Sequence, residues 1–305
     1  MPRISDRIIS AVVYVYPTYE CARRGDAAGG TGFLVCLPME GEPEAGHLFV
    51  VTASHVVGHA APGAWIRINR SSGETECVEI GGAQWIHHPS GDDVAAAPIN
   101  IDIEPLDVMC IPPEWFLTRE LAVQVDLGPG DEVFFVGRLK HYDGGDSNRP
   151  SARFGNLSMM PTRIRLRQSG MGQESFVVEA RSLSGYSGSA VFVHFPPMTP
   201  RPSVKLAADQ RHVLERRGAG PYLLGVDVAH LGSPAAIRDA QGEPVSEGWQ
   251  VDSNSGMLAV VPAWKVAELF ETPEVEAILR EDRAAWAAQH SGGGQSETGG
   301  TAGSI

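Results

Sequence analysis

Short apolar runs separated by turn residues occupy most of the chain. Each run is rich in β-branched or aromatic residues, and Gly, Pro, Asp and Asn cluster between the runs. This pattern predicts many short strands, as in an all-β barrel or sandwich. No helical periodicity interrupts them, which excludes a parallel α/β sheet, because its strands alternate with helices. The clearest predicted strands are residues 11–16, 32–37, 48–53, 64–68, 94–99, 132–136, 175–180, 190–193, 222–228 and 257–261.

A short segment that contains two prolines divides these strands into two groups of similar size. Pro112 and Pro113 precede a Trp-Phe pair between the two strand-rich halves. We therefore expect an N-terminal β-barrel over residues 1–117 and a C-terminal β-barrel over residues 118–262.

After Pro262 the apolar period changes from that of a strand to that of a helix. Apolar residues recur on one helical face from Val266, and Thr272-Pro273 begins a second helix. We expect C-terminal helices over residues 263–290, packed on the second barrel. The Gly/Ser/Thr-rich residues 291–305 predict a disordered tail.

Composition and charge narrow the function classes. The 305 residues are 43% hydrophobic, enough to bury a sizeable core. A formal net charge of -13 disfavours general binding to nucleic acid or to an anionic membrane. The apolar stretch Ile8–Tyr16 is too short for a signal or membrane segment and is interpreted as a first strand. Four scattered cysteines without CxxC pairs predict reduced thiols, no zinc site and a cytoplasmic location.

One histidine lies where a general base is commonly placed. The apolar run Phe49–Ala53 leads through Ser54 to His55. A histidine just past a buried strand is held rigidly and still reaches a cleft, as proton transfer requires. A lone histidine in this setting is more often structural, so its interpretation depends on its partners.

Two further segments supply those partners. Asp93 opens a predicted strand, where a carboxylate can fix the tautomer of an imidazole. Ser187 lies between glycines in Gly185-Tyr186-Ser187-Gly188, which permits a tight turn that exposes its hydroxyl. Either segment alone would be an ordinary surface turn, but together with His55 they predict a nucleophilic serine.

The three segments resemble the motifs of trypsin/chymotrypsin-like serine peptidases, most closely the bacterial, disulfide-poor branch with the HtrA-type enzymes. Thr52-Ala53-Ser54-His55 resembles the family's TAxH motif, and Asp93-Val94-Ala95 resembles its D-[LIV]-A motif. Residues 185–191, GYSGSAV, resemble its nucleophile motif. The motifs follow the family's order, and similarity extends over about residues 8–270.

The resemblance implies two six-stranded antiparallel β-barrels and a serine endopeptidase that needs no cofactor or metal. The catalytic triad would be His55, Asp93 and Ser187, with Gly185 and Ser187 N–H groups as the oxyanion hole. A protein or peptide substrate would lie as a strand beside residues 226–229. The residues implied in substrate binding are Arg181, Ser182 and Val228, with Arg181 near the floor of the pocket for the residue before the scissile bond.

Some alternatives stay open. Tyr186 stands where the family usually has Asp or Asn, which favours a catalytically silent scaffold used for binding or regulation. With either function, the acidic second barrel and its helices are compatible with a regulatory protein partner. His87-His88 with Asp92-Asp93 suggests a metal site, although neighbouring strand residues point to opposite faces and a solvated turn is favoured. An α/β-hydrolase is excluded because its triad runs in the reverse order.

Overall fold

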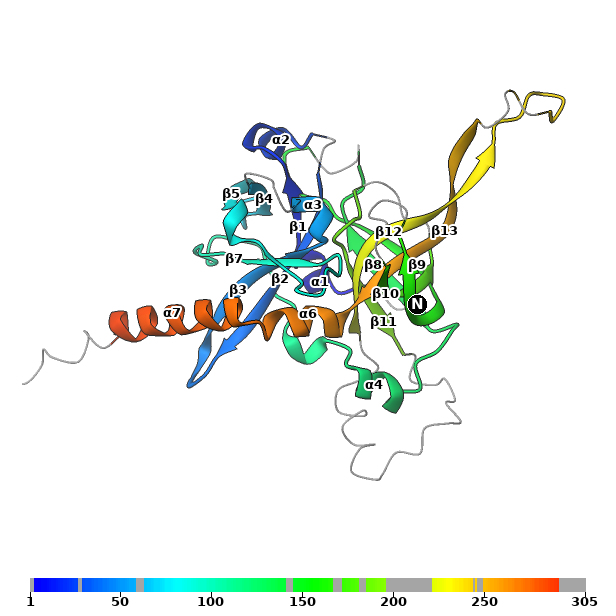
Figure 1. The fold of residues 1–305 in the computed structure, drawn as a ribbon. Helices are drawn as coiled ribbons and strands as arrows, with labels where there is room; N and C mark the ends of the chain where they lie inside the picture. The colour runs from blue at the N-terminus through cyan, green and yellow to red at the C-terminus, as the bar shows by residue number, and fades with distance from the viewer. Residues whose placement is uncertain are drawn as a thin grey trace, which may run out of the picture.

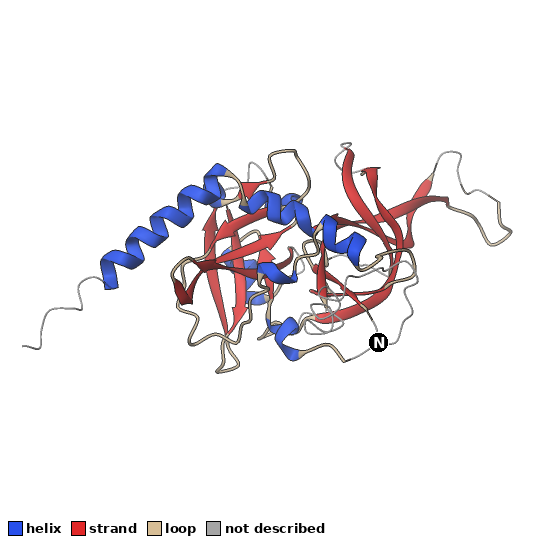
Figure 2. Ribbon diagram, turned by 90° about the horizontal axis from the view of Figure 1, so that it is seen from below, coloured by secondary structure: helices blue, strands red, loops and turns tan. Residues whose placement is uncertain are grey.

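The computed structural model describes residues 3–26, 29–58, 63–140, 145–166, 172–180, 185–195, 221–243, 245 and 249–290. Two β-sheet units lie side by side, and the C-terminal helices run across them (Figures 1 and 2). The strand order confirms the predicted two-barrel, chymotrypsin-like, all-β fold. No helix in these ranges is long and apolar enough to span a membrane. All four cysteines are free thiols.

The first unit is a curled antiparallel sheet of seven strands in the order β5-β4-β1-β2-β3-β7-β6. Its two edge strands, β5 and β6, are consecutive in the chain and are joined by a short turn, η1 (Gly82–Gln84), so the sheet curls back on itself. It therefore has one strand more than the six expected, and its ring of hydrogen bonds is not closed. The strands are β1 (Val12–Tyr16), β2 (Gly30–Met39), β3 (Glu42–Thr52), β4 (Gly63–Asn69), β5 (Thr75–Gly81), β6 (Ile86–His87) and β7 (Ala95–Pro98).

The second unit is a closed barrel in the order β10-β13-β12-β11-β8-β9. Two of its strands continue beyond the barrel as a two-stranded arm, in which Gly232–Ala236 pairs with Gln250–Asn254 (Figure 1). The large apolar side chains of Trp249 and Val251 are exposed on this arm. The strands are β8 (Glu132–Gly137), β9 (Ser151–Arg165), β10 (Gly172–Glu179), β11 (Ala190–His194), β12 (Tyr222–Ala236) and β13 (Gln250–Pro262).

The helices are short except at the C-terminal end of the described chain. They are α1 (Asp6–Ser10), α2 (Tyr19–Arg24), α3 (Ser54–Val57), η2 (Pro113–Trp115), α4 (Arg119–Gln124), α6 (Ala263–Phe270) and α7 (Pro273–His290). The first strand is thus shorter than predicted, because its expected beginning forms α1 and β1 starts only at Val12.

Helices α6 and α7 follow the last strand, as the predicted fold requires, but their packing differs from the expectation. α6 contacts β12 and β13 of the second unit, whereas Phe270 at its end packs edge-to-face on Phe49 of the first. α7 continues over the first unit, where Asp282 lies 2.9 Å from the Nδ1 atom of His47. The helices therefore bridge the two units.

A continuous apolar core also joins the two units. One cluster includes Phe33 of the first sheet, Phe192 of the second barrel and Leu269 of α6. At the predicted boundary near residue 117, the Leu117 N–H donates to the Leu223 carbonyl of β12 at 3.0 Å. The division of the chain at that residue stays a prediction.

Candidate active site

Strand pairing in the first unit brings His55 to Asp93. β3 ends at Thr52, which pairs with Ala95 at the start of β7. Because the two strands are antiparallel, the residues that follow β3 lie beside those that precede β7. The chain leaves β3 through buried Ala53 into α3, the short helix that carries His55.

Both oxygens of the Asp93 carboxylate bind His55. The His55 backbone N–H donates to Oδ1 at 2.8 Å, and the imidazole Nδ1 lies 2.7 Å from Oδ2. A proton on Nδ1 leaves Nε2 with a free lone pair, which is the tautomer that a general base needs. The His55 side chain is 41% exposed and that of Asp93 18%, so the base reaches solvent while its partner is sheltered.

The charge balance around His55 favours its protonated form. Burial disfavours the imidazolium, but the hydrogen bond to Asp93 and the negative charges of Asp93 and Asp227 outweigh that penalty. The pKa of His55 is therefore raised above its ordinary value. An imidazole tuned in this direction is a stronger base than a free one.

Glycine geometry shapes the turn that carries Ser187. Gly185 and Gly188 have φ angles of 104° and 90°, in a region that other residues seldom adopt. The Ser189 N–H donates to the Tyr186 carbonyl at 2.8 Å, and the Gly188 N–H donates to the Asp227 carbonyl at 2.7 Å. In a trans peptide the N–H points away from the carbonyl, so the Ser187 N–H faces away from Ser189. In the described chain, neither it nor the Gly185 N–H donates a hydrogen bond.

Thr31 of β2 ties this turn to the first unit. Its backbone N–H donates to the Ser187 carbonyl at 2.9 Å, and its hydroxyl donates to the Gly185 carbonyl at 2.7 Å. The adjacent Gly30 is equally close: a Cβ there would lie 2.9 Å from the Ser187 carbonyl oxygen and 2.8 Å from Val56. Since Val56 follows His55, the structure brings the main chain of Ser187 alongside the helix of His55.

The Ser187 side chain is less constrained than its main chain. It is partly buried, and no hydrogen bond joins its hydroxyl to His55 among the residues that the structure describes. Such contacts are often loose in the absence of substrate and tighten when substrate binds.

Tyr186 is an internal anchor for the turn. The residue is fully buried, and its ring packs edge-to-face on Phe135 with centroids 5.3 Å apart. Its hydroxyl accepts from Nε of Arg153 at 3.1 Å and also hydrogen-bonds the hydroxyl of Ser151. The tyrosine therefore fastens the turn to β8 and β9, where the resemblance predicted Asp or Asn.

The residues predicted to contact substrate are only partly described. Arg181 and Ser182 lie outside the described residues. Val228 is described, and its side chain is buried in the core. Any contact of residue 228 with a bound peptide would therefore be made by its main chain.

The residues of the alternative metal site form three different contacts. His87 Nδ1 lies 2.6 Å from the Ser54 hydroxyl, whereas His88 Nδ1 lies 3.2 Å from Asp92 Oδ2. Asp93 is occupied by His55. In the described ranges, no group of three or more His, Cys, Asp or Glu side chains is placed to hold a metal ion.

Two residues near the site were missed by sequence reasoning. The Gln173 side chain on β10 accepts a hydrogen bond from the Asp93 N–H at 2.9 Å. Asp227 on β12 adds its charge to the field at His55. Asp227 had a signal, since it interrupts the apolar run 222–228, but Gln173 had none because its contact depends on the packing of two separate sheets.

Comparison with known proteins gives similarity in structure only. No protein-family model and no curated protein matches the chain. The protease domain of MamO from Magnetospirillum magneticum is 14% identical, covers 87% of this chain and 98% of its own, and superposes with a TM-score of 0.48. A mutant of Rv3671c from M. tuberculosis H37Rv, in an inactive form, is 15% identical, with coverage of 88% of both chains and a TM-score of 0.44.

A third similar structure is the HtrA-type protease AlgW with a decapeptide. It is 15% identical, and the match covers 87% of this chain and 66% of that chain with a TM-score of 0.44. The fold assignment rests on the strand topology of this chain and not on these distant likenesses.

Proposed function

We propose that the protein is a serine endopeptidase in which His55, Asp93 and Ser187 form the catalytic triad. His55 Nε2 removes the proton from the Ser187 hydroxyl as Oγ attacks the peptide carbonyl. The N–H groups of Gly185 and Ser187 bind the oxyanion. His55 then passes its proton to the departing amine, which leaves an acyl-enzyme, and water activated by His55 hydrolyses that ester and restores Ser187.

The observation that carries this proposal is the double contact between Asp93 and His55. One carboxylate fixes both the ring and the backbone of His55. The arrangement leaves Nε2 as the base and stabilises the imidazolium formed during attack. The hydrogen bonds from Thr31 hold the Ser187 turn against β2 of the first unit, which supports the proposal.

A protein or peptide substrate has a strand edge available to it. β12 pairs with β11 as far as Val226, and the Asp227 N–H and carbonyl bind Ser189 and Gly188, although the strand continues to Ala236. A substrate beside residues 226–229 would therefore add as a further strand through main-chain groups that follow Asp227. We further propose that Arg181 favours an acidic or polar substrate side chain before the scissile bond. A peptide library that is cleaved mainly after basic residues would refute that role.

Labelling with a fluorophosphonate probe tests the catalytic proposal directly. The probe should modify the protein at neutral pH, and chelator should not change the rate. Labelling should disappear in Ser187→Ala and fall strongly in His55→Ala. Ser189→Ala is the matched control, because that serine is two residues away and fully buried, and its hydroxyl has no hydrogen-bond partner in the described chain. Labelling that survives Ser187→Ala would place the nucleophile elsewhere.

Two observations favour a second candidate, a silent scaffold that binds proteins or peptides. Within the described residues the Ser187 hydroxyl has no hydrogen bond to His55, and Tyr186 replaces the polar residue expected beside it. A folded wild-type protein that is never labelled, alone or with candidate partners, would support this function over hydrolysis.

A further inference from the structure

The carboxylate of the proposed triad is held from the opposite unit. Gln173 lies on β10 of the second barrel, where it is 6% exposed, and its Oε1 accepts the backbone N–H of Asp93 at 2.9 Å. Asp93 itself belongs to the loop between β6 and β7 of the first unit. The contact therefore crosses the junction between the two sheets.

This single hydrogen bond acts on the main chain that aims the carboxylate. Both side-chain oxygens of Asp93 bind His55. Another residue can therefore hold Asp93 in place through the Asp93 backbone N–H. Gln173 holds that N–H on one side while His55 holds the carboxylate on the other. A shift of the loop would lengthen both contacts with His55 together.

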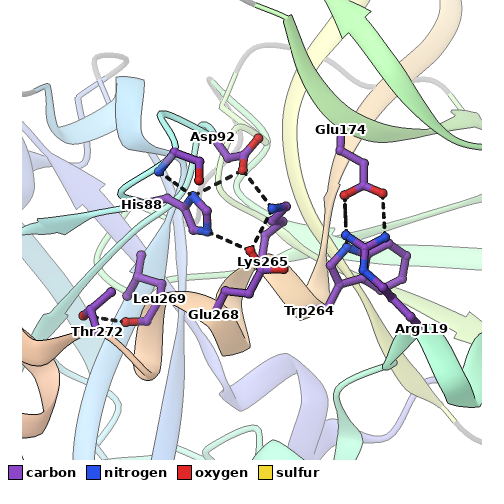
Figure 3. A network of polar contacts seen from close by, with 10 residues as sticks. His88, Asp92, Arg119, Glu174, Trp264, Lys265, Glu268, Leu269 and Thr272 are labelled. Atoms are coloured by element: carbon purple, nitrogen blue, oxygen red, sulfur yellow. Dashed lines mark hydrogen bonds and ion pairs between the residues drawn. The ribbon is translucent and has the colours of Figure 1, made fainter.

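Helix α6 braces the two neighbours of this pair (Figure 3). Asp92, next to Asp93, lies 3.4 Å from the ammonium of Lys265. Glu174, next to Gln173, accepts from the indole N–H of Trp264 at 3.3 Å. Asp92 and Glu174, the sequence neighbours of Asp93 and Gln173, are thus held by two consecutive residues of one helix.

Glu174 has a further tether. It forms a two-pronged ion pair with Arg119, at 2.8 Å and 2.6 Å, and that guanidinium lies 4.5 Å above the Trp264 ring. Hydrogen bonding from Arg119 is the main reason that the pKa of Glu174 is lowered. The contacts of Glu174 with Arg119 and Trp264 therefore restrict backbone motion of β10 at the adjacent residue 173.

We propose that Gln173 is a positioning residue for catalysis, which sets the orientation of Asp93 toward His55 across the junction of the two units. This inference rests on the proposed peptidase function. Gln173 does not touch the reacting atoms and acts only through Asp93. Its importance follows from geometry, since misplacing a catalytic group by about 1 Å costs on the order of 10²-fold in rate.

The test replaces Gln173 by Met, which keeps the length and burial of the side chain but removes the acceptor. We expect kcat for peptide hydrolysis to fall on the order of 10²-fold, with KM changed little. We also expect the pKa of His55, followed by NMR, to fall toward its ordinary value, because its contacts with Asp93 loosen while the charge of Asp227 remains. Ser175→Ala is the matched control: this buried serine lies two residues along β10, and its hydroxyl lacks a hydrogen-bond partner among the described residues.

The outcomes separate this inference from the proposed function. If wild-type protein does not hydrolyse peptides but the His55 pKa still falls in Gln173→Met alone, the positioning role stands and the peptidase function fails. If Gln173→Met keeps full kcat and an unchanged His55 pKa, or if Ser175→Ala has the same effects, the positioning role is refuted. Should Gln173→Met not fold, hydrogen exchange in the wild-type protein decides: a protected Asp93 amide supports the contact, and rapid exchange overturns it.

Discussion

The two halves of the candidate active site are held in different ways. On the side of His55 and Asp93, side chains bind side chains and a backbone N–H, and the contacts carry charge. On the side of Ser187, most contacts are made by main-chain carbonyls and N–H groups, supplemented by the hydroxyls of Thr31 and Tyr186, and glycine geometry provides the shape. The first half should therefore respond to changes of charge and protonation, and the second to changes of shape.

The largest effect is expected from the charged half. Asp93→Asn should lower the labelling rate on the order of 10⁴-fold, as the same exchange does in the well-studied serine protease triad, because an amide permits the wrong imidazole tautomer. Asp92→Asn is the control at the adjacent position. It weakens the contact with Lys265 and should cost about 1–3 kcal/mol of unfolding free energy with little loss of labelling. If Asn at 92 is the damaging change and Asn at 93 is mild, the assignment of the carboxylate is wrong.

The next effect tests the shape of the other half. Gly188→Ala imposes a φ angle near 90° on alanine, and the new methyl group overlaps the Thr31 carbonyl oxygen and the Thr52 hydroxyl. We expect labelling to fall on the order of 10²-fold, because the turn must move away from the first unit.

Gly130→Ala separates the effect of backbone strain in Gly188→Ala from the effect of steric overlap. Gly130 has a φ of 100°, but a Cβ there would meet nothing within 4 Å. This variant should lose about 1–3 kcal/mol of stability from backbone strain alone and keep its labelling rate. Equal labelling by the two alanine variants would show that the tether to Thr31 is dispensable.

A smaller effect is expected at the anchor of the turn. Tyr186→Phe keeps the buried ring against Phe135 but leaves the Nε of Arg153 without its acceptor. Thermal or denaturant unfolding should show a loss of about 1–3 kcal/mol, and labelling should fall about tenfold or less. Ser151→Ala removes only one of the two polar contacts and should lie between this variant and wild type. If Tyr186→Phe has the stability and the labelling rate of the wild-type protein, ring packing alone fixes the turn.

The smallest effect concerns pH. Only neutral His55 can accept a proton, so the labelling rate should rise with pH through a midpoint above the ordinary histidine value of 6.5. Asp227→Asn removes one of the two negative charges and should move that midpoint down. An unmoved midpoint, measured by the same titration in both proteins, would show that Asp93 alone sets the pKa.

The same pKa shift predicts how stability depends on pH. A group whose pKa is higher in the folded than in the unfolded state stabilises the fold below its unfolded pKa, and this contribution is lost as pH rises through the folded pKa. Wild type should therefore exceed Asp93→Asn in stability by more at pH 5 than at pH 9. A stability difference between the two proteins that is independent of pH would show that the contact between Asp93 and His55 does not depend on the charge of His55.

Sequence reasoning succeeded where the signal is local. Apolar runs predicted the core strands, and the turn residues around His55, Asp93 and Ser187 identified segments that the fold does bring together. Strand β9 was missed because Leu157 is its only buried residue and it carries Pro161, so no apolar alternation distinguishes it. The outer parts of β12 and β13 were missed for a similar reason, since they form the arm and do not face the core.

Contacts between distant elements were beyond the reach of local patterns. The apolar face of α6 predicted a buried helix, but nothing in its period indicates which sheet it covers. The continuation of α7 over the first unit depends on contacts such as Asp282 with His47. Gln173 is the sharpest case, because an uncharged polar residue within a strand has no distinguishing spacing, and its role follows only from the contact with Asp93.

The closed second barrel has a consequence for the order of events during synthesis. β13 pairs with both β10 and β12, so the ring cannot close until residues 250–262 have left the ribosome. Chains grow from the N-terminus, and contacts of such large sequence separation form late in folding. The strand that carries Asp227, and with it the carbonyl that binds Gly188, is supported on one side by this last strand. A nascent chain would thus complete its Ser187 turn only near the end of translation, and ribosome-bound chains that stop before residue 250 should not react with the active-serine probe.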